Sequence, residues 1–139
     1  MPNQLGLAPT GSADLVEEAV EVLAAEARAL GYNWSFTPVI DINARLRSAI
    51  VTTRSYGAQP EAILALALRS VRAFHRAGIA ATAKHWPGEG FDDRDQHLVT
   101  TQIPLTVDDW QASFRQQPRV CPQCPRGRPA YAVHPSLLP

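Results

Sequence analysis

The chain is poor in cysteine, in net charge and in long apolar runs. Its 139 residues contain two cysteines, Cys121 and Cys124, and one such pair does not support a disulfide framework. Basic and acidic side chains balance at 13 each, so no general attraction to nucleic acid or to an anionic membrane is implied. No run approaches the roughly 20 apolar residues that cross a bilayer, and no membrane segment is expected.

The amino terminus, Met1-Pro2-Asn3-Gln4, also lacks the basic and apolar regions of a secretory leader. A cytoplasmic location is the expectation that follows. A hydrophobic content of 45% is enough for a buried core, and the length corresponds to about one ordinary domain.

Two helices and two strands are expected to alternate along the first part of the chain. Ser12 or Asp14 can cap a helix from 13 to 30 that stops at Gly31, and residues 34–40 have the composition of a strand. Pro60 suits the first position of a second helix, and Gly78 ends it. The apolar run 77–83, which contains Gly78, is expected to supply the second strand. The inward face of the first helix is predicted to carry Leu15, Ala19, Val22, Leu23 and Leu30, and that of the second Ile63, Leu64, Leu66, Ala67, Leu68, Val71 and Phe74.

The two ends of the chain depart from this pattern. Residues 1–12, with Pro9 and Gly11, are expected to form a flexible tail. A capping box at Thr106 opens a third helix, but from 116 to 139 the chain is rich in proline and arginine and shows neither helical nor strand periodicity. This last segment is predicted to be irregular, and a frameshift would account for the abrupt change.

The densest polar segment, residues 84–97, directly follows the apolar run 77–83. It holds Lys84, His85 and His97, four carboxylates and two glycines. In α/β folds with parallel strands, ligands bind beyond the carboxyl ends of the strands, so this segment is a candidate active-site loop. Asp95 and His97 are two residues apart, which places both side chains on one side of an extended backbone, where the carboxylate can orient the imidazole.

Two spaced motifs resemble the amino-terminal barrel domain of glycoside hydrolase family 3, in its β-N-acetylhexosaminidase branch. The first is Asn33-Trp34-Ser35-Phe36-Thr37-Pro38-Val39-Ile40-Asp41-Ile42-Asn43, followed by Arg54-Ser55-Tyr56-Gly57 and Pro60. The second is Lys84-His85-Trp86-Pro87-Gly88, then Gly90 and Asp95-Gln96-His97. Two motifs in the right order are more specific than either alone.

The resemblance implies a fold, an activity and a set of site residues. The fold is an α/β, partial TIM-type (β/α)8 barrel over residues 13–115, because a complete barrel needs about 250 residues. The activity is retaining hydrolysis of terminal N-acetylglucosamine β-glycosidic bonds, in the recycling of cell-wall muropeptides, without a cofactor or metal. His97 would be the catalytic acid/base and Asp95 would orient its ring, while Arg54, Lys84 and His85 would bind the carbohydrate substrate.

Other interpretations of the same residues stay open. A metal-dependent hydrolase would use His85, Asp93, Asp95 and His97 as ligands. The nucleophilic aspartate of the family is not recognisable here, so the chain would alternatively be a non-catalytic remnant. Asp41, Asp92 and Asp93 are interpreted as loop-capping or solvated carboxylates, and Cys121, Cys124 and His134 are too few ligands for a zinc site.

Overall fold

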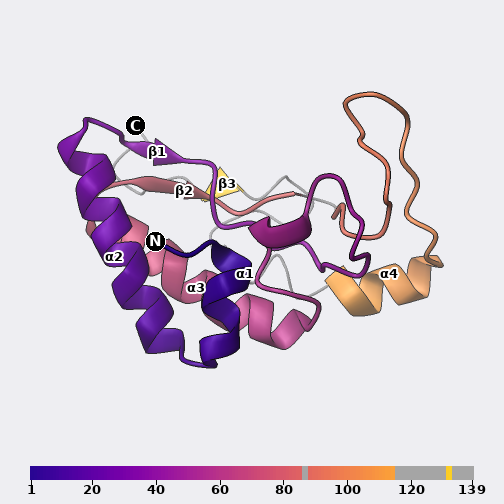
Figure 1. Cartoon of the computed structure of the whole chain (residues 1–139), viewed down its shortest axis with the longest axis horizontal. Helices are drawn as coiled ribbons and strands as arrows, with labels where there is room; N and C mark the ends of the chain where they lie inside the picture. The colour runs from indigo at the N-terminus through magenta and orange to yellow at the C-terminus, as the bar shows by residue number, and fades with distance from the viewer. Residues whose placement is uncertain (86–87, 115–130, 133–139) are drawn as a thin grey trace.

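The computed structural model describes residues 1–85, 88–114 and 131–132. Its helices are α1 (Gln4–Leu7), α2 (Ala13–Ala29), α3 (Pro60–Arg76) and α4 (Val107–Phe114), with 3-10 turns η1 (Ala8–Thr10) and η2 (Thr52–Arg54). The strands are β1 (Trp34–Ser35), β2 (Ala80–Thr82) and β3 (Tyr131–Ala132). Figure 1 shows α2 and α3 side by side below the strands, with the segment before α4 extending away from this body.

The first two strands form a parallel pair joined through α3. Trp34 pairs with Ala80 and Ser35 with Ala81, so β1, α3 and β2 make a βαβ unit. Backbone hydrogen bonds continue this alignment beyond β1, and the Ile40 N–H donates to the carbonyl of Lys84 at 2.7 Å. The α/β class and the parallel pairing are therefore confirmed.

The helix boundaries follow from the capping residues that the sequence offers. The Ser12 hydroxyl accepts the Leu15 N–H at the start of α2, and Gly31 follows the helix with φ of 90°. Pro60 is the first residue of α3, and Gly78 follows that helix with φ of 72°. Thr106 caps α4 by accepting the Asp109 N–H at 3.1 Å.

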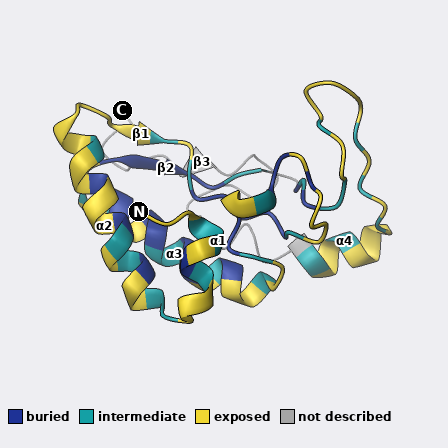
Figure 2. Cartoon of the chain, viewed as in Figure 1, coloured by how far each residue is buried: buried dark blue, intermediate teal, exposed yellow. Residues whose placement is uncertain are grey.

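The buried face of α2 differs from the predicted one. Leu15, Val22, Leu23 and Leu30 are exposed, and Ala19 alone of the predicted face is partly buried. Val16, Val20 and Ala24 face the core instead. The prediction was wrong because apolar residues surround most of this helix, so spacing alone admits two faces. The packing against α3 selects between them, and Figure 2 shows the buried sides of the two helices turned toward each other and toward β2.

The ends of the chain also differ from expectation. Gln4–Leu7 is helical in the segment expected to be a flexible tail, because the Asn3 side chain caps it and Leu7 is buried. The Gln4 side-chain amide bonds both the N–H and the carbonyl of Val39, which ties α1 to the strand end. In the segment expected to be irregular, β3 pairs antiparallel with β2. The domain boundaries at 13 and 115 stay predictions.

The helices and β2 share one hydrophobic core. Residues next to the polar segment after β1 also pack into it. The α1, α2, α3 and β2 residues cluster with Ile40, Ile42 and Tyr56 from the region between β1 and α3. Within the described ranges, no helix is long and apolar enough to cross a membrane.

Candidate functional site

The carboxyl ends of the two parallel segments bring Asp41 beside His85. Asp41 directly follows the 34–40 segment, and His85 follows Lys84, whose carbonyl accepts the Ile40 N–H. This backbone bond holds the two positions together although they are 44 residues apart in the chain. The site therefore begins where the parallel pairing ends.

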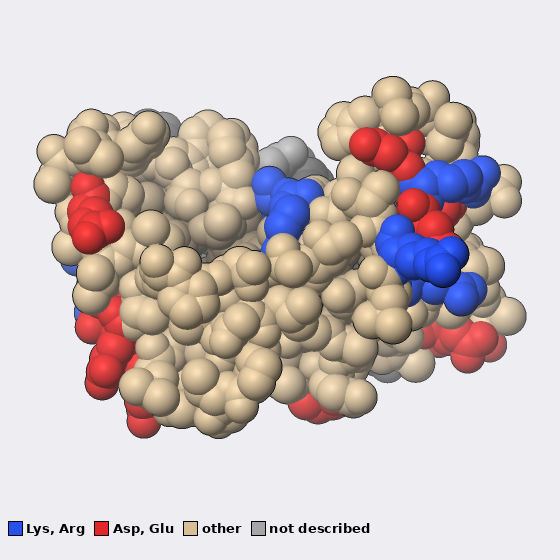
Figure 3. Space-filling view, viewed as in Figure 1, with Lys and Arg blue, Asp and Glu red and all other residues tan. Residues whose placement is uncertain are grey.

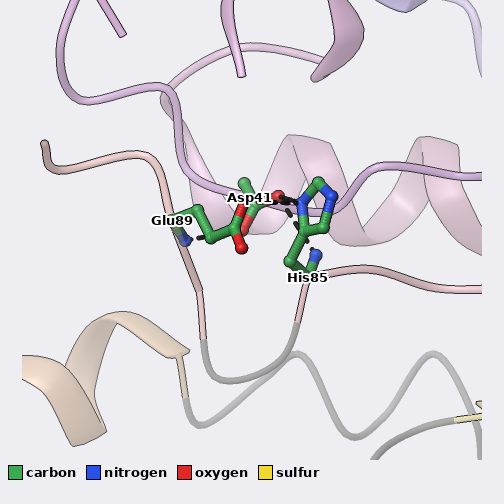
Figure 4. Close-up of side chains that lie close together, drawn as sticks. All are labelled: Asp41, His85 and Glu89. Carbon is green, nitrogen blue, oxygen red and sulfur yellow. Dashed lines mark hydrogen bonds and ion pairs between the residues drawn. The ribbon is translucent and has the colours of Figure 1, made fainter. Parts of the chain in front are cut away.

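Asp41 is a fully buried carboxylate with two backbone N–H donors and the Nδ1 of His85 around it. Its Oδ2 accepts the backbone N–H of His85 at 3.1 Å and lies 2.6 Å from the His85 Nδ1, while its Oδ1 accepts the backbone N–H of Glu89 at 2.8 Å. In Figure 4 the Asp41 carboxylate lies between the two limbs of the loop that carry His85 and Glu89. The predicted loop-capping role is confirmed, whereas the solvated alternative is wrong because the side chain has no exposed surface.

Glu89 joins this cluster to the next part of the loop. One of its carboxylate oxygens lies 3.3 Å from the His85 Nδ1, and the other accepts the side-chain N–H of Gln96. Gln96 lies between Asp95 and His97 in the sequence. A continuous chain of polar contacts thus runs from the buried strand end to the Asp95–His97 segment.

Asp95 and His97 are hydrogen-bonded to each other, but not on the extended backbone that the sequence predicts. The Asp95 carbonyl accepts the N–H groups of Leu98 and Val99, so the pair lies in a turn. The two atoms Asp95 Oδ1 and His97 Nδ1 are 2.6 Å apart, and the same oxygen accepts the His97 backbone N–H at 2.8 Å. These two bonds, the backbone one foremost, lower the pKa of the Asp95 carboxyl. Both side chains reach solvent, His97 with 73% of its side chain exposed, so the pair is open to a ligand.

The neighbouring carboxylates serve the loop itself. Asp92 accepts side-chain bonds from Arg94 and backbone N–H bonds from Arg94 and Gln102, which hold its pKa well below the usual range. Its predicted loop-capping role is confirmed. Asp93 is exposed, in agreement with the predicted solvated role.

Arg54 and Lys84 line a common cavity of about 280 Å³. Its walls are largely apolar and come from α1, α2, α3 and the 36–39 segment, with Phe36, Tyr56 and Phe74 among them. Burial, then the nearby Arg54 charge, lowers the pKa of the Lys84 ammonium. Figure 3 shows basic side chains at a hollow near the middle of this face, while most acidic side chains lie toward the two ends.

The structure thus divides the predicted site residues into three groups. Arg54 and Lys84 share the cavity, His85 is held by Asp41, and Asp95 pairs with His97 in the loop. His85, Asp95 and His97 are not among the residues that line the cavity. The catalytic and substrate-binding roles of these residues stay predictions, and Trp86 and Pro87 lie outside the described residues.

The metal alternative requires His85, Asp93, Asp95 and His97 together, and that set is not assembled. In the part of the chain that the structure describes, the group with donor atoms within 4.8 Å of one another is Asp41, His85 and Glu89. At 2.6 Å, the Asp41–His85 contact is a direct hydrogen bond in which the N–H already occupies the space between the two atoms. Cys121, Cys124 and His134 lie outside the described residues.

Sequence reasoning missed Asp41 and Glu89 as members of the site. For Asp41 a signal was present, because it directly follows the segment 34–40, which the sequence predicts to be a strand although β1 covers only Trp34–Ser35. Lys84 and His85 follow the parallel strand β2 at the same edge. For Glu89 the sequence holds no such signal, since its position depends on how the loop folds back.

A polar loop beyond the carboxyl ends of parallel strands, with an exposed carboxylate–imidazole pair, is an arrangement typical of α/β enzymes. The sequence model for the glycosyl hydrolase family 3 N-terminal domain matches residues 1–116. This chain belongs to glycoside hydrolase family 3.

Curated relatives agree with this assignment. The chain is 46% identical over 112 residues to a β-N-acetylglucosaminidase/β-glucosidase of Cellulomonas fimi, a match covering 81% of this chain and 20% of the relative. It is 32% identical over 127 residues to a β-hexosaminidase of Pseudomonas aeruginosa, covering 91% of this chain and 38% of that protein. The chain therefore spans about a fifth to two fifths of the length of these relatives.

Solved structures give the same family. A family 3 β-N-acetylglucosaminidase of Paenibacillus superposes with a TM-score of 0.77 at 36% identity, over 84% of this chain and 22% of that one. A protein described as the β-glucoside phosphorylase BglX superposes with a TM-score of 0.81 at 34% identity, over 86% of this chain and 21% of that one.

Proposed function

We propose that this chain is the acid/base-bearing part of a retaining β-N-acetylglucosaminidase whose amino-terminal domain is a (β/α)8 barrel. The observation that carries the proposal is the Asp95–His97 hydrogen bond of 2.6 Å in an exposed loop beyond the parallel strands. A carboxylate bonded to Nδ1 fixes the tautomer in which Nε2 is the reactive nitrogen. His97 would protonate the leaving glycosidic oxygen and then accept a proton from the attacking water.

Arg54 and Lys84 would bind the sugar, since both line the cavity and offer N–H donors to hydroxyl and acetamido oxygens. The support for N-acetylglucosamine as the sugar is the chemistry named for the Cellulomonas and Paenibacillus relatives. Those names do not specify the aglycone, so a muropeptide substrate is a proposal from the family resemblance. The cytoplasmic location likewise stays a prediction.

Retention requires a carboxylate nucleophile, and the sequence offers no recognisable one. The chain alone is therefore expected to give little or no turnover of p-nitrophenyl N-acetyl-β-glucosaminide. The decisive experiment transfers residues 13–115 into the matching segment of the Cellulomonas fimi relative, which supplies the remainder of the barrel. This chimera is expected to release p-nitrophenol.

Two variants of the chimera test the assigned roles. His97→Gln is expected to lower the hydrolysis rate by about 10²–10⁴-fold, the usual contribution of a general acid/base. Asp93→Asn removes an exposed carboxylate from the same loop and is expected to leave the rate unchanged. Equal losses in both variants would contradict the role of His97.

One similar solved structure is described as a phosphorylase, so the same assay should also test whether water or phosphate accepts the sugar from the glycosyl-enzyme. Adding inorganic phosphate would accelerate release and yield the sugar 1-phosphate if phosphate, rather than water, resolves the glycosyl-enzyme. Hydrolysis predicts free N-acetylglucosamine at every phosphate concentration. Parallel reactions with an N-acetylglucosamine-containing muropeptide test the proposed aglycone.

A further inference from the structure

The two imidazoles of the loop each have a carboxylate at Nδ1, but the two pairs differ in burial. The distance is 2.6 Å in both. Asp95 has 34% of its side chain exposed, whereas Asp41 has none. A buried carboxylate cannot exchange its N–H partners for water, so the Asp41–His85 contact is the more rigid of the two.

The proton of the Asp41–His85 bond must come from the imidazole. An ionised carboxylate only accepts hydrogen bonds, and the remaining partners of Asp41 are the backbone N–H groups of His85 and Glu89, which only donate. The neutral His85 ring therefore carries its proton on Nδ1. Its Nε2 is then a hydrogen-bond acceptor.

Backbone hydrogen bonds hold the segment that carries this ring. The Ile40 N–H bond to the Lys84 carbonyl precedes both residues, and the Glu89 N–H bond closes the loop onto the same carboxylate. A further backbone bond, from the Ala44 N–H to the Gly90 carbonyl, also holds the loop against the 40–44 segment. His85 keeps 20% of its side chain exposed, so the held ring still reaches the surface.

We propose that Asp41 is a positioning residue for His85: it holds the ring as the Nδ1–H tautomer and presents Nε2 as a fixed hydrogen-bond acceptor toward the hydroxyl of a bound sugar. The identity of the ligand rests on the proposed function, whereas the tautomer and its dependence on Asp41 do not. Glu89 has a lesser role toward His85, because its oxygen lies 3.3 Å from Nδ1 rather than 2.6 Å.

The test is a long-range ¹H–¹⁵N correlation spectrum of the histidine rings of the ¹⁵N-labelled full chain, at a pH high enough that the rings are neutral. The chain has four histidines, and a His85→Gln variant identifies the signals of His85. The expected wild-type pattern has a protonated Nδ1 and a bare Nε2. A ring protonated on Nε2 would overturn the proposal without any variant.

Two matched variants then separate the pairs. Asp41→Asn is expected to convert His85 to a tautomer mixture and to leave His97 unchanged, while Asp95→Asn should do the reverse. If the Asp41→Asn variant is folded, judged by circular dichroism, and its His85 signals equal those of the wild type, the proposal is contradicted. If Asp41→Asn does not fold, the proposal is tested by the wild-type spectrum and by Glu89→Gln. The Glu89→Gln variant is expected to keep the Nδ1–H tautomer of His85, and its loss there would contradict the role of Asp41.

The KM and kcat of the chimera test whether the orientation of His85 affects substrate binding. In the chimera, Asp41→Asn is expected to raise KM about tenfold with a smaller change in kcat, because it loosens a substrate-binding group and not the acid/base. An inactive chimera would remove the proposed function and leave the tautomer result intact. An active chimera whose KM is unchanged by Asp41→Asn would contradict the positioning role toward substrate.

Discussion

Gly90 shows at the scale of one residue how tightly the loop is pressed against the strand end. A methyl group built at its Cα would lie 1.6 Å from the carbonyl oxygen of Ile42, which is a backbone atom and cannot rotate away. The Gly90 carbonyl also accepts the Ala44 N–H at 3.1 Å. Glycine is required here by the close approach of two backbone segments and not by a left-handed conformation.

We predict that Gly90→Ala destabilises the chain by about 1–3 kcal/mol, because the loop must move to admit the methyl group. The measurement is the free energy of unfolding from urea titration followed by circular dichroism. Gly6→Ala is the control: it makes the same change inside α1, where the nearest atoms belong to the side chains of Pro2 and Asn3 and are at least 3.2 Å away. Equal destabilisation by the two substitutions would contradict this account.

In helix α2, the spacing of the apolar residues is compatible with two different buried faces. Leu15 and Val22 have helical spacing, and so do Val16 and Val20, which are the buried pair. The distinction is made by α3, because Arg69 and Arg76 pair with Glu17 and Glu21 and so fix which side of α2 faces α3. These bonds lower the pKa of the Glu17 carboxyl, the Arg76 contact foremost. No property of α2 alone contains this information.

We predict that Val16→Ala costs about 2 kcal/mol of stability, since Val16 has no exposed surface and loses two buried methyl groups. Val22→Ala is the matched control in the same helix, with 60% of the residue exposed, and is expected to change stability by less than about 0.5 kcal/mol. Thermal and urea unfolding of both variants give the comparison. A larger loss of stability for Val22→Ala than for Val16→Ala would contradict this assignment of the buried face of α2.

Across the whole molecule, the accuracy of sequence-based prediction depends on the distance over which the determining contacts act. Helix ends were predictable because Ser12, Gly31, Pro60 and Gly78 act on their immediate neighbours. The contact between Asp95 and His97 was predictable for the same reason, since the two residues are two positions apart, although a turn and not an extended backbone brings them together. The Asp41–His85 bond was missed because it spans 44 residues and forms only after the parallel segments align.

The surface of the whole molecule combines exposed apolar side chains with a formal charge of zero. Leu30, Tyr32, Trp34 and Phe36 are each more than half exposed, and they lie from the end of α2 to just beyond β1. Exposed apolar side chains favour association, and a protein near its isoelectric point has little net repulsion to oppose it. The chain should therefore self-associate most strongly near pH 7.

We predict that sedimentation velocity detects oligomers at pH 7 and a larger monomer fraction at pH 5 or pH 9, where the molecule carries net positive or net negative charge. Leu30→Lys is expected to raise the monomer fraction at pH 7, because residue 30 is 78% exposed and the charge would interrupt the apolar surface without touching the core. Ala58→Lys adds the same charge at an exposed position outside this surface and controls for net charge alone. If both lysine variants dissociate the oligomers equally, the net charge governs association; if only Leu30→Lys does, the apolar surface forms the contact. A monomeric wild-type chain at pH 7 would contradict the prediction.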